Sequence, residues 1–128
     1  MTGENILIVE DNPGNLKLEK ALFDSFGYNV KTANTAQIAL EVLTEFEPRL
    51  IIMDIQLPGM SGLELTRKLK ADPKYKNIII VAVTAYAMLG DKEKILAAGC
   101  DAYIAKPLDI DTLPGIIQKL ITEYSDVE

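Results

Sequence analysis

The chain has 128 residues, of which 48% are apolar, a length and composition typical of one globular domain with a sizeable core. Its formal net charge of −6 argues against nucleic acid as a direct ligand, because phosphate backbones are bound by basic surfaces. One cysteine, no signal-peptide pattern and no run near the roughly 18 apolar residues of a membrane span indicate a cytoplasmic protein. The chain has no histidine, so histidine metal ligands are excluded and any phosphohistidine chemistry needs an outside donor.

Short apolar runs with strand character alternate with segments of helical spacing along the chain. Five strands are predicted, at residues 5–10, 28–33, 50–53, 78–83 and 101–105. The third and fourth runs, LIIM and IIIVAV, have no polar alternation, which is typical of strands covered on both faces. The second run, YNVKTA, alternates apolar and polar residues, which is typical of a half-exposed strand at a sheet edge.

Cap and turn residues mark the helices between these strands. Asn12 and Pro13 suit the cap and first position of one helix, and Asn34 or Thr35 caps the next. Ser61, followed three residues later by Glu, predicts a capping box for the third helix. The predicted helices cover about residues 13–26, 36–46, 62–70, 87–98 and 108–124, and Pro114 favours a later start for the last one.

Alternation of strands and helices predicts an α/β fold, with a doubly wound five-stranded parallel sheet and helices on both faces. The pattern leaves two strand orders open, 2-1-3-4-5 and 3-2-1-4-5. The half-exposed character of the second strand fits an edge position in the first of these orders. Residues 1–128 are expected to form one domain.

The carboxyl ends of parallel strands share one edge of the sheet, where open α/β folds place their ligand chemistry. The residues at these ends are Glu10 and Asp11, Asp54, Thr84 and Lys106. Three acids this close repel one another unless a cation joins them, and an all-oxygen set of ligands favours Mg²⁺. Lysine and threonine bind phosphoryl oxygens well, so a carboxylate beside them is a plausible phosphoryl acceptor. Each residue alone has an ordinary structural explanation; their joint placement at four of five strand ends indicates a site.

These motifs closely resemble the receiver domain of bacterial two-component response regulators. The resemblance covers about residues 5–124 and is carried by ILIVEDN, IIMDIQLPGMSGLEL, VAVTA and AYIAKP, in the order and spacing of the family. The wording of MDIQLPGMSGLE, VTAYAM and GCDAYIAKP is similar to stand-alone regulators of the DivK type. The resemblance implies the CheY-like, flavodoxin-like strand order 2-1-3-4-5.

The resemblance also implies a role for each acid of the site. Asp54 would be the phosphoacceptor. Glu10 and Asp11 would hold Mg²⁺ together with Asp54 and the backbone carbonyl of Gln56.

Three further residues would respond to phosphorylation in a protein of this family. Lys106 would pair with the phosphoryl group, and Thr84 would move towards it. Tyr103 would then rotate inward to fill the space that Thr84 leaves. The resemblance also implies a cis peptide bond between Lys106 and Pro107.

The predicted function is therefore a phosphorylation switch and not an enzyme in the usual sense. A histidine kinase or a histidine phosphotransfer protein would supply the phosphoryl group to Asp54. No output domain is expected after Glu128, so the signal would pass through protein–protein contacts of the fourth helix, fifth strand and fifth helix to a downstream target. Homodimerisation on phosphorylation stays open, and neither nucleic acid nor a membrane span is expected.

Three other functions were weighed against the switch. A haloacid-dehalogenase-like aspartyl-phosphate hydrolase would carry its nucleophile after the first strand as D-x-D, whereas that strand here ends in Glu10, Asp11 and Asn12. A flavodoxin-like flavin carrier would need a phosphate-binding loop at the same place, where two acids would repel the phosphate. An adaptor that is never phosphorylated would have no need for Asp54 together with Lys106.

Overall fold

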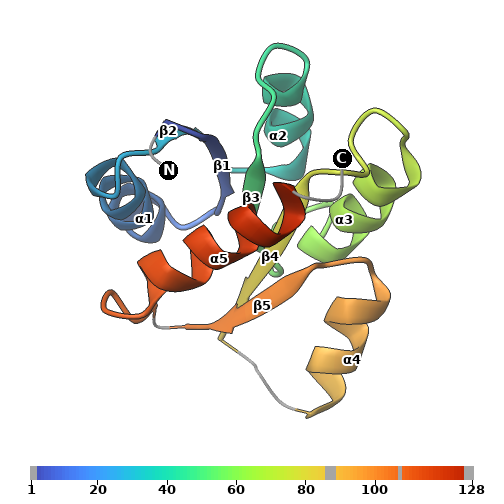
Figure 1. The fold of residues 1–128 in the computed structure, drawn as a ribbon. Coiled ribbons are helices and arrows are strands. Elements are labelled where there is room, and N and C mark those ends of the chain that lie inside the picture. The colour runs from blue at the N-terminus through green and yellow to red at the C-terminus, as the bar shows by residue number, and fades with distance from the viewer. Residues whose placement is uncertain (1–2, 86–88, 107, 126–128) are drawn as a thin grey trace.

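All five predicted strands form one parallel sheet in the order β2-β1-β3-β4-β5 (Figure 1), which confirms order 2-1-3-4-5 and excludes 3-2-1-4-5. The structure is a computed structural model and describes residues 3–85, 89–106 and 108–125. The prediction that the second strand lies at an edge is also confirmed. The strands are β1 (Asn5–Val9), β2 (Asn29–Ala33), β3 (Leu50–Asp54), β4 (Ile79–Thr84) and β5 (Ala102–Ala105).

Helices cover both faces of this sheet, as the crossover connections require. They are α1 (Pro13–Ser25), α2 (Ala36–Leu43), α3 (Gly62–Ala71), α4 (Leu89–Ala97) and α5 (Leu113–Ser125). Apolar residues of α1 and α5 pack in one core cluster, and those of α2, α3 and α4 pack in the other. Figure 1 shows α1 and α5 on the viewer's side of the sheet. Among the residues described, no helix is long and apolar enough to cross a membrane.

The central strands are buried on both faces, which explains their unbroken apolar runs. Every residue of β3 and of β4 is buried. Successive residues of β3 alternate between the two cores: Leu50 and Ile52 contact the α1 and α5 side, whereas Ile51 and Met53 contact the other side. The strand is therefore clamped from both faces, and its last residue, Asp54, has a well-defined position.

The helix starts follow the predicted caps. The Asn12 side chain accepts a hydrogen bond from the Asn15 amide at 3.0 Å, and Pro13 is the first residue of α1. Thr35, and not Asn34, caps α2, because its hydroxyl accepts from the Ile38 amide at 3.1 Å. The Ser61 capping box is present at the start of α3. These caps satisfy amides that have no partner inside the helix.

One helix ends earlier than predicted, and the later start predicted for the last helix is confirmed. Helix α2 ends at Leu43 because the Thr44 amide and hydroxyl both turn back to the Glu41 carbonyl, at 3.2 and 2.7 Å. Helix α5 begins only at Leu113, after a turn in which the Asp109 side chain accepts from the Asp111 amide at 2.9 Å. Pro114 thus lies in the first turn, where a missing amide hydrogen is harmless. The predicted start of α4 at residues 87–88 and the cis bond before Pro107 lie outside the described residues.

Candidate functional site

The carboxyl ends of the strands gather the predicted site residues at one edge of the sheet, called here the carboxyl edge. Asp54 is the last residue of β3 and pairs with Val83 in β4, which places it beside the end of that strand. Glu10 and Asp11 directly follow β1, the neighbour of β3 on its other side. The carboxylates of Glu10, Asp11 and Asp54 each have an oxygen within 4.8 Å of the others. We call these three residues the acid cluster.

Glu10 is the most connected member of the acid cluster. Its side chain is buried, and one oxygen accepts a hydrogen bond from the Asn12 amide at 3.2 Å. The other oxygen, Oε1, lies 2.9 Å from Lys106 Nζ. Burial acts to raise the pKa of Glu10, but hydrogen bonds from Asp54, Lys106 and the Asn12 amide outweigh it and lower that pKa. The surroundings of Glu10 therefore favour its ionised form.

The pKa of Asp54 is shifted in the opposite direction to that of Glu10. The residue is 5% exposed, its Oδ1 accepts from the Gln56 amide at 3.1 Å, and its Oδ2 lies 3.7 Å from Lys106 Nζ. Burial, together with the hydrogen bond to the Glu10 carboxylate, raises the pKa of Asp54 to about 7. The two carboxyls therefore repel each other when both are ionised, and a divalent cation beside them would reduce this repulsion.

The acid cluster fits a hard divalent cation. It offers only carboxylate oxygens, with two members buried and held in place and the third, Asp11, exposed to solvent. Mg²⁺ in proteins is held by few carboxylates and keeps several of its waters, which suits a site open on one side. The Gln56 amide is fixed by its bond to Asp54, but assignment of the Gln56 carbonyl as a ligand stays a prediction.

Gly62 is a further residue of the site that sequence reasoning missed. It is the first residue of α3, and its amide donates to the Ile55 carbonyl at 2.9 Å. A Cβ at this position would overlap the Asp54 carbonyl oxygen. The Thr66 hydroxyl donates to the Gly62 carbonyl at 2.8 Å and ties the turn to α3. The glycine therefore allows the start of α3 to pack directly against the backbone of Asp54. The Ser61-Gly62 pair after Pro58-Gly59 was the sequence signal that could have identified this residue.

Comparison with known proteins decides the family. The model of the response regulator receiver domain matches residues 6–118. The chain belongs to the receiver domain family. The polar-differentiation response regulators DivK of Brucella ovis and Brucella anthropi are each 46% identical over 123 residues, which is 96% of this chain and 98% of the relative.

Solved receiver domains share the fold. A CheY-like receiver domain protein from Methanospirillum hungatei superimposes with a TM-score of 0.90 at 32% identity, covering 99% of this chain and 100% of that one. The receiver domain of a sensor histidine kinase from Pseudomonas aeruginosa has a TM-score of 0.86 at 36% identity, covering 94% and 99%. That structure has a magnesium ion coordinated in its active site cleft.

The predicted switch residues of this receiver domain lie on β4 and β5. Thr84 is buried at the end of β4, and its carbonyl accepts from the Lys106 amide at 2.8 Å. Tyr103 pairs with Ala82 across the sheet and is half-buried, with its ring packed against the core on the α2, α3 and α4 side. Lys92 Nζ of α4 lies 5.8 Å from the centroid of that ring. Tyr103 therefore stands between the core and α4; its role as a switch stays a prediction.

Glu19 on α1 is the second residue that sequence reasoning missed. It is 5% exposed and follows Leu16 by three residues and precedes Phe23 by four, so it lies on the apolar face of its helix. Burial, followed by the negative charge of Glu10, raises the pKa of Glu19 to about 8. An acid at helical spacing within an apolar stripe was the signal that could have found it.

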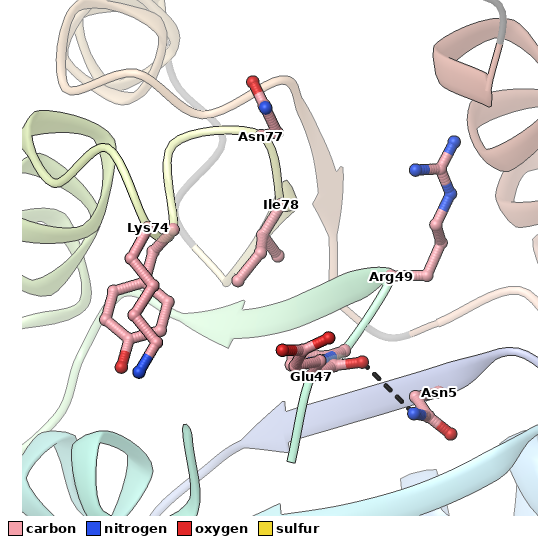
Figure 2. A pocket seen from close by; sticks show the side chains of 8 residues that line it. Asn5, Glu47, Arg49, Lys74, Asn77 and Ile78 are labelled. Carbon is pink, nitrogen blue, oxygen red and sulfur yellow. Dashed lines mark hydrogen bonds between the residues drawn. The ribbon is translucent and has the colours of Figure 1, made fainter. Parts of the chain in front are cut away.

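A hollow lies at the edge of the sheet opposite the carboxyl edge, where the strands begin. It has a volume of about 380 Å³ and is formed where β1, β3 and β4 begin (Figure 2). Figure 2 shows Glu47 beside Asn5, whose side chain donates to the Glu47 carbonyl at 3.1 Å, with Arg49 and Lys74 in the same lining. Its charges are mixed and it gathers no set of carboxylates, so the acid cluster is the better candidate for the functional site.

Proposed function

We propose that this receiver domain accepts a phosphoryl group on Asp54 from the phosphohistidine of a histidine kinase or a histidine phosphotransfer protein, with Mg²⁺ as cofactor. The observation that carries the proposal is the buried Asp54 carboxyl at the carboxyl edge, with two further acids within 4.8 Å and Lys106 Nζ at 3.7 Å. Membership of the receiver family supports it, because phosphoryl acceptance is general in that family. The absence of histidine from the chain fits an outside donor.

Asp54 provides the attacking oxygen of the transfer. Its Oδ forms a bond to phosphorus as the phosphorus–nitrogen bond to the donor's histidine breaks, and the histidine nitrogen keeps the electron pair of that bond. The donor's ring carries a proton on its other nitrogen, so the products are an acyl phosphate on Asp54 and a neutral histidine. Glu10, Asp11, Asp54 and the Gln56 carbonyl would hold Mg²⁺, which supplies neutralising charge for the phosphoryl oxygens.

The Lys106 ammonium would change its partner from the acid cluster to a phosphoryl oxygen when Asp54 is phosphorylated. Its ammonium lies 2.9 Å from Glu10 Oε1 and 3.7 Å from Asp54 Oδ2, so a short movement brings it to a phosphoryl oxygen on Asp54. The Lys106 amide is held by the Thr84 carbonyl, so the side chain moves from an anchored backbone. Lys106 acts as a point charge, which tolerates such a change of partner.

The signal would leave through the face formed by α4, β5 and α5. Thr84 would turn its hydroxyl towards the phosphoryl group, and Tyr103 would rotate inward behind it. Helices α4 and α5 each expose an apolar side chain, Leu96 at 45% and Ile116 at 38%, which supports a protein partner on this face. A downstream protein target fits this surface, and phosphorylation-dependent pairing of two copies is an alternative use of it.

Intact mass after treatment with acetyl phosphate and MgCl₂ tests the proposal. We expect the wild type to gain one phosphoryl group, and Asp54→Asn or addition of EDTA to abolish the gain. Asp24→Asn is the matched control, because Asp24 pairs with Lys20 on the exposed surface, and it should gain one phosphoryl group like the wild type. Beryllium fluoride, a stable stand-in for the phosphoryl group, is added in parallel with amide NMR as the readout, so that a short-lived acyl phosphate is still detected.

Two other outcomes would overturn the proposal. Folded wild type that responds to neither reagent would favour an adaptor that is never phosphorylated. Continuous release of inorganic phosphate from small phosphomonoesters, lost in Asp54→Asn, would favour a hydrolase.

A further inference from the structure

Glu19 is a buried acid to which the proposed function gives no role. Five polar or charged side chains are buried among the described residues, and three of them, Glu10, Asp54 and Thr84, belong to the site. Thr66 is satisfied by its bond to the Gly62 carbonyl. Only Glu19 remains, a carboxyl that is 5% exposed on the inner face of α1. Since a buried carboxyl without partners is strongly unfavourable, its partners indicate what it does.

The partner of Glu19 is the acid cluster. Its carboxyl is hydrogen-bonded to the carboxyl of Glu10, and it also feels the charges of Lys106 and Asp54. Glu10 is thus held from three separate segments: by the Asn12 amide at 3.2 Å, by Lys106 Nζ at 2.9 Å and by Glu19 from α1. Glu19 and Lys106 also line the same hollow of about 430 Å³ beside the site.

Packing alone would favour an apolar residue at this position. The same hollow is lined by Leu18, Leu22, Leu108 and Ile110, so most of the side chains around Glu19 in this hollow are apolar. Replacing a buried acid by a well-packed apolar residue is often neutral or stabilising. A carboxyl here therefore gives no advantage in stability, and its benefit lies in what it does to Glu10.

We propose that Glu19 is a positioning residue of the cation site, whose carboxyl fixes Glu10 where it reaches both the cation and Lys106. This inference rests on the proposed function, because it assumes that Glu10 is a ligand. Residues that hydrogen-bond a metal ligand without touching the metal contribute strongly to metal affinity. Losing one typically weakens metal binding 10- to 100-fold. Lys106 would be affected as well, since Glu10 Oε1 is its nearest acid at 2.9 Å.

The test compares Glu19→Gln with Glu19→Met. Glutamine keeps a hydrogen-bond donor for Glu10, whereas methionine has a similar length and no such group. Glu41→Met is the matched control, because Glu41 is an exposed glutamate of α2. The Mg²⁺ dissociation constant is measured by amide NMR during titration of the unphosphorylated protein with MgCl₂, and folding stability by urea unfolding.

We expect Glu19→Met to weaken Mg²⁺ binding by about 10-fold or more while its urea midpoint stays equal to or above that of the wild type. Glu19→Gln and Glu41→Met should bind Mg²⁺ within about threefold of the wild type, a margin well inside that 10-fold loss. A role in stability alone would produce the reverse pattern, with a lower urea midpoint and unchanged affinity.

Two results would overturn the inference while leaving the proposed function intact: unchanged Mg²⁺ affinity in a folded Glu19→Met variant, or equal losses in the Gln and Met variants. If Glu19→Met does not fold, Glu19→Leu takes its place under the same criteria. A wild type that does not bind Mg²⁺ at all would instead overturn the proposed metal site, and the inference with it.

Discussion

Replacing Gly62 by alanine is expected to separate the start of α3 from the end of β3, where Asp54 lies. Gly62 is the first residue of α3, and its amide bonds the Ile55 carbonyl at 2.9 Å. The added Cβ would overlap the Asp54 carbonyl oxygen and would lie 2.9 Å from both the Asp54 carbonyl carbon and Ile55 Cα. All three are backbone atoms, so no side-chain rotation can make room.

The size of the effect follows from what must move. Ordinary contacts of a Cβ begin at 3.4 Å, so the two carbon contacts alone require a shift of roughly half an ångström, and the oxygen requires more. Strand β3 is paired with β1 and β4 and is fully buried, so α3 must yield instead. Overpacking of this kind costs about 1–3 kcal/mol, and a weakened Gly62 amide hydrogen bond adds about 1 kcal/mol. We expect a total loss of about 2–4 kcal/mol in the free energy of unfolding.

Urea unfolding measures this loss, with Gly115→Ala as the matched control. A Cβ at Gly115 in α5 meets nothing within 4 Å, so alanine there should stabilise the protein by about 0.5–1 kcal/mol through helix propensity. Because the shift occurs at the Asp54 backbone, phosphorylation by acetyl phosphate should also slow in Gly62→Ala and stay unchanged in Gly115→Ala. Gly62→Ala with wild-type stability and unchanged Asp54 and Ile55 amide signals would refute the reasoning.

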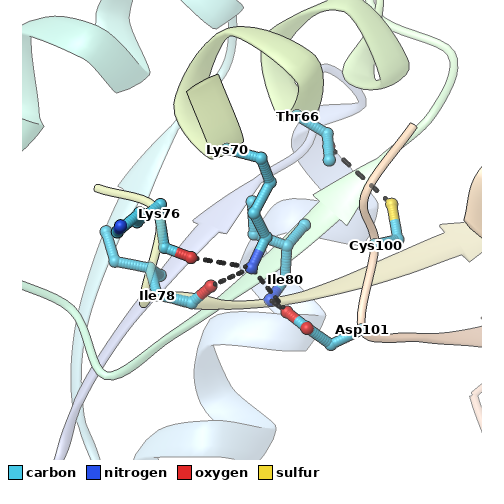
Figure 3. A network of polar contacts seen from close by, with 7 residues as sticks. All are labelled: Thr66, Lys70, Lys76, Ile78, Ile80, Cys100 and Asp101. Carbon is cyan, nitrogen blue, oxygen red and sulfur yellow. Dashed lines mark hydrogen bonds and ion pairs between the residues drawn. The ribbon is translucent and has the colours of Figure 1, made fainter. Parts of the chain in front are cut away.

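Two further predictions concern the half-buried Lys70 and the buried carboxyl of Glu19. Lys70 Nζ donates to two backbone carbonyls, at 3.2 and 2.8 Å, and to the Asp101 carboxylate at 2.9 Å (Figure 3). Lys70→Met should therefore lower the free energy of unfolding, measured with urea, by about 1–3 kcal/mol. The control Lys20→Met breaks only an exposed ion pair and should lower it by about 0.5 kcal/mol or less. Burial raises the pKa of Glu19 from 4.5 to about 8, so between these pH values the folded protein holds a proton that the unfolded chain has released. The free energy of unfolding should therefore fall as pH rises from about 5 to 8, by on the order of 2–4 kcal/mol more in the wild type than in Glu19→Gln. Urea unfolding at several pH values measures this difference. An equal dependence of the unfolding free energy on pH in the two proteins would contradict the prediction.

The position of the acid cluster could be predicted from the sequence because it depends on few assumptions. Once strands and helices alternate, the sheet is parallel and all carboxyl ends share one edge. Asp54 and Lys106 are 52 positions apart in the chain, yet both directly mark the end of an apolar run. Errors of one or two residues in the strand boundaries leave this conclusion unchanged.

Features that depend on local geometry could not be predicted in the same way. The apolar pattern of α2 continues to Phe46, which is indeed buried, but the helix ends at Leu43 because Thr44 bonds back to its own last turn. Similarly, Gly62 was predicted only as the first residue of a capped helix, because only coordinates reveal that a Cβ there would meet the Asp54 backbone. Hydrophobic periodicity reports which face is buried and contains no information on such contacts.

The balance of charge at the carboxyl edge explains why Glu10, and not Asp54, anchors the site. Glu10 is bound by Lys106 at 2.9 Å, by the Asn12 amide and by Glu19, whereas Asp54 accepts from the Gln56 amide at 3.1 Å and has Lys106 only at 3.7 Å. Under the proposed function, Asp54 would change its partners when it is phosphorylated, so fixed contacts would be expected on its neighbour Glu10. The surroundings lower the pKa of Glu10 and raise that of Asp54, and positive charge beside both acids would favour ionised Asp54, the form that would attack phosphorus under the proposed function. Under the proposed function, the same cluster would make Asp54 a better nucleophile once a cation is bound.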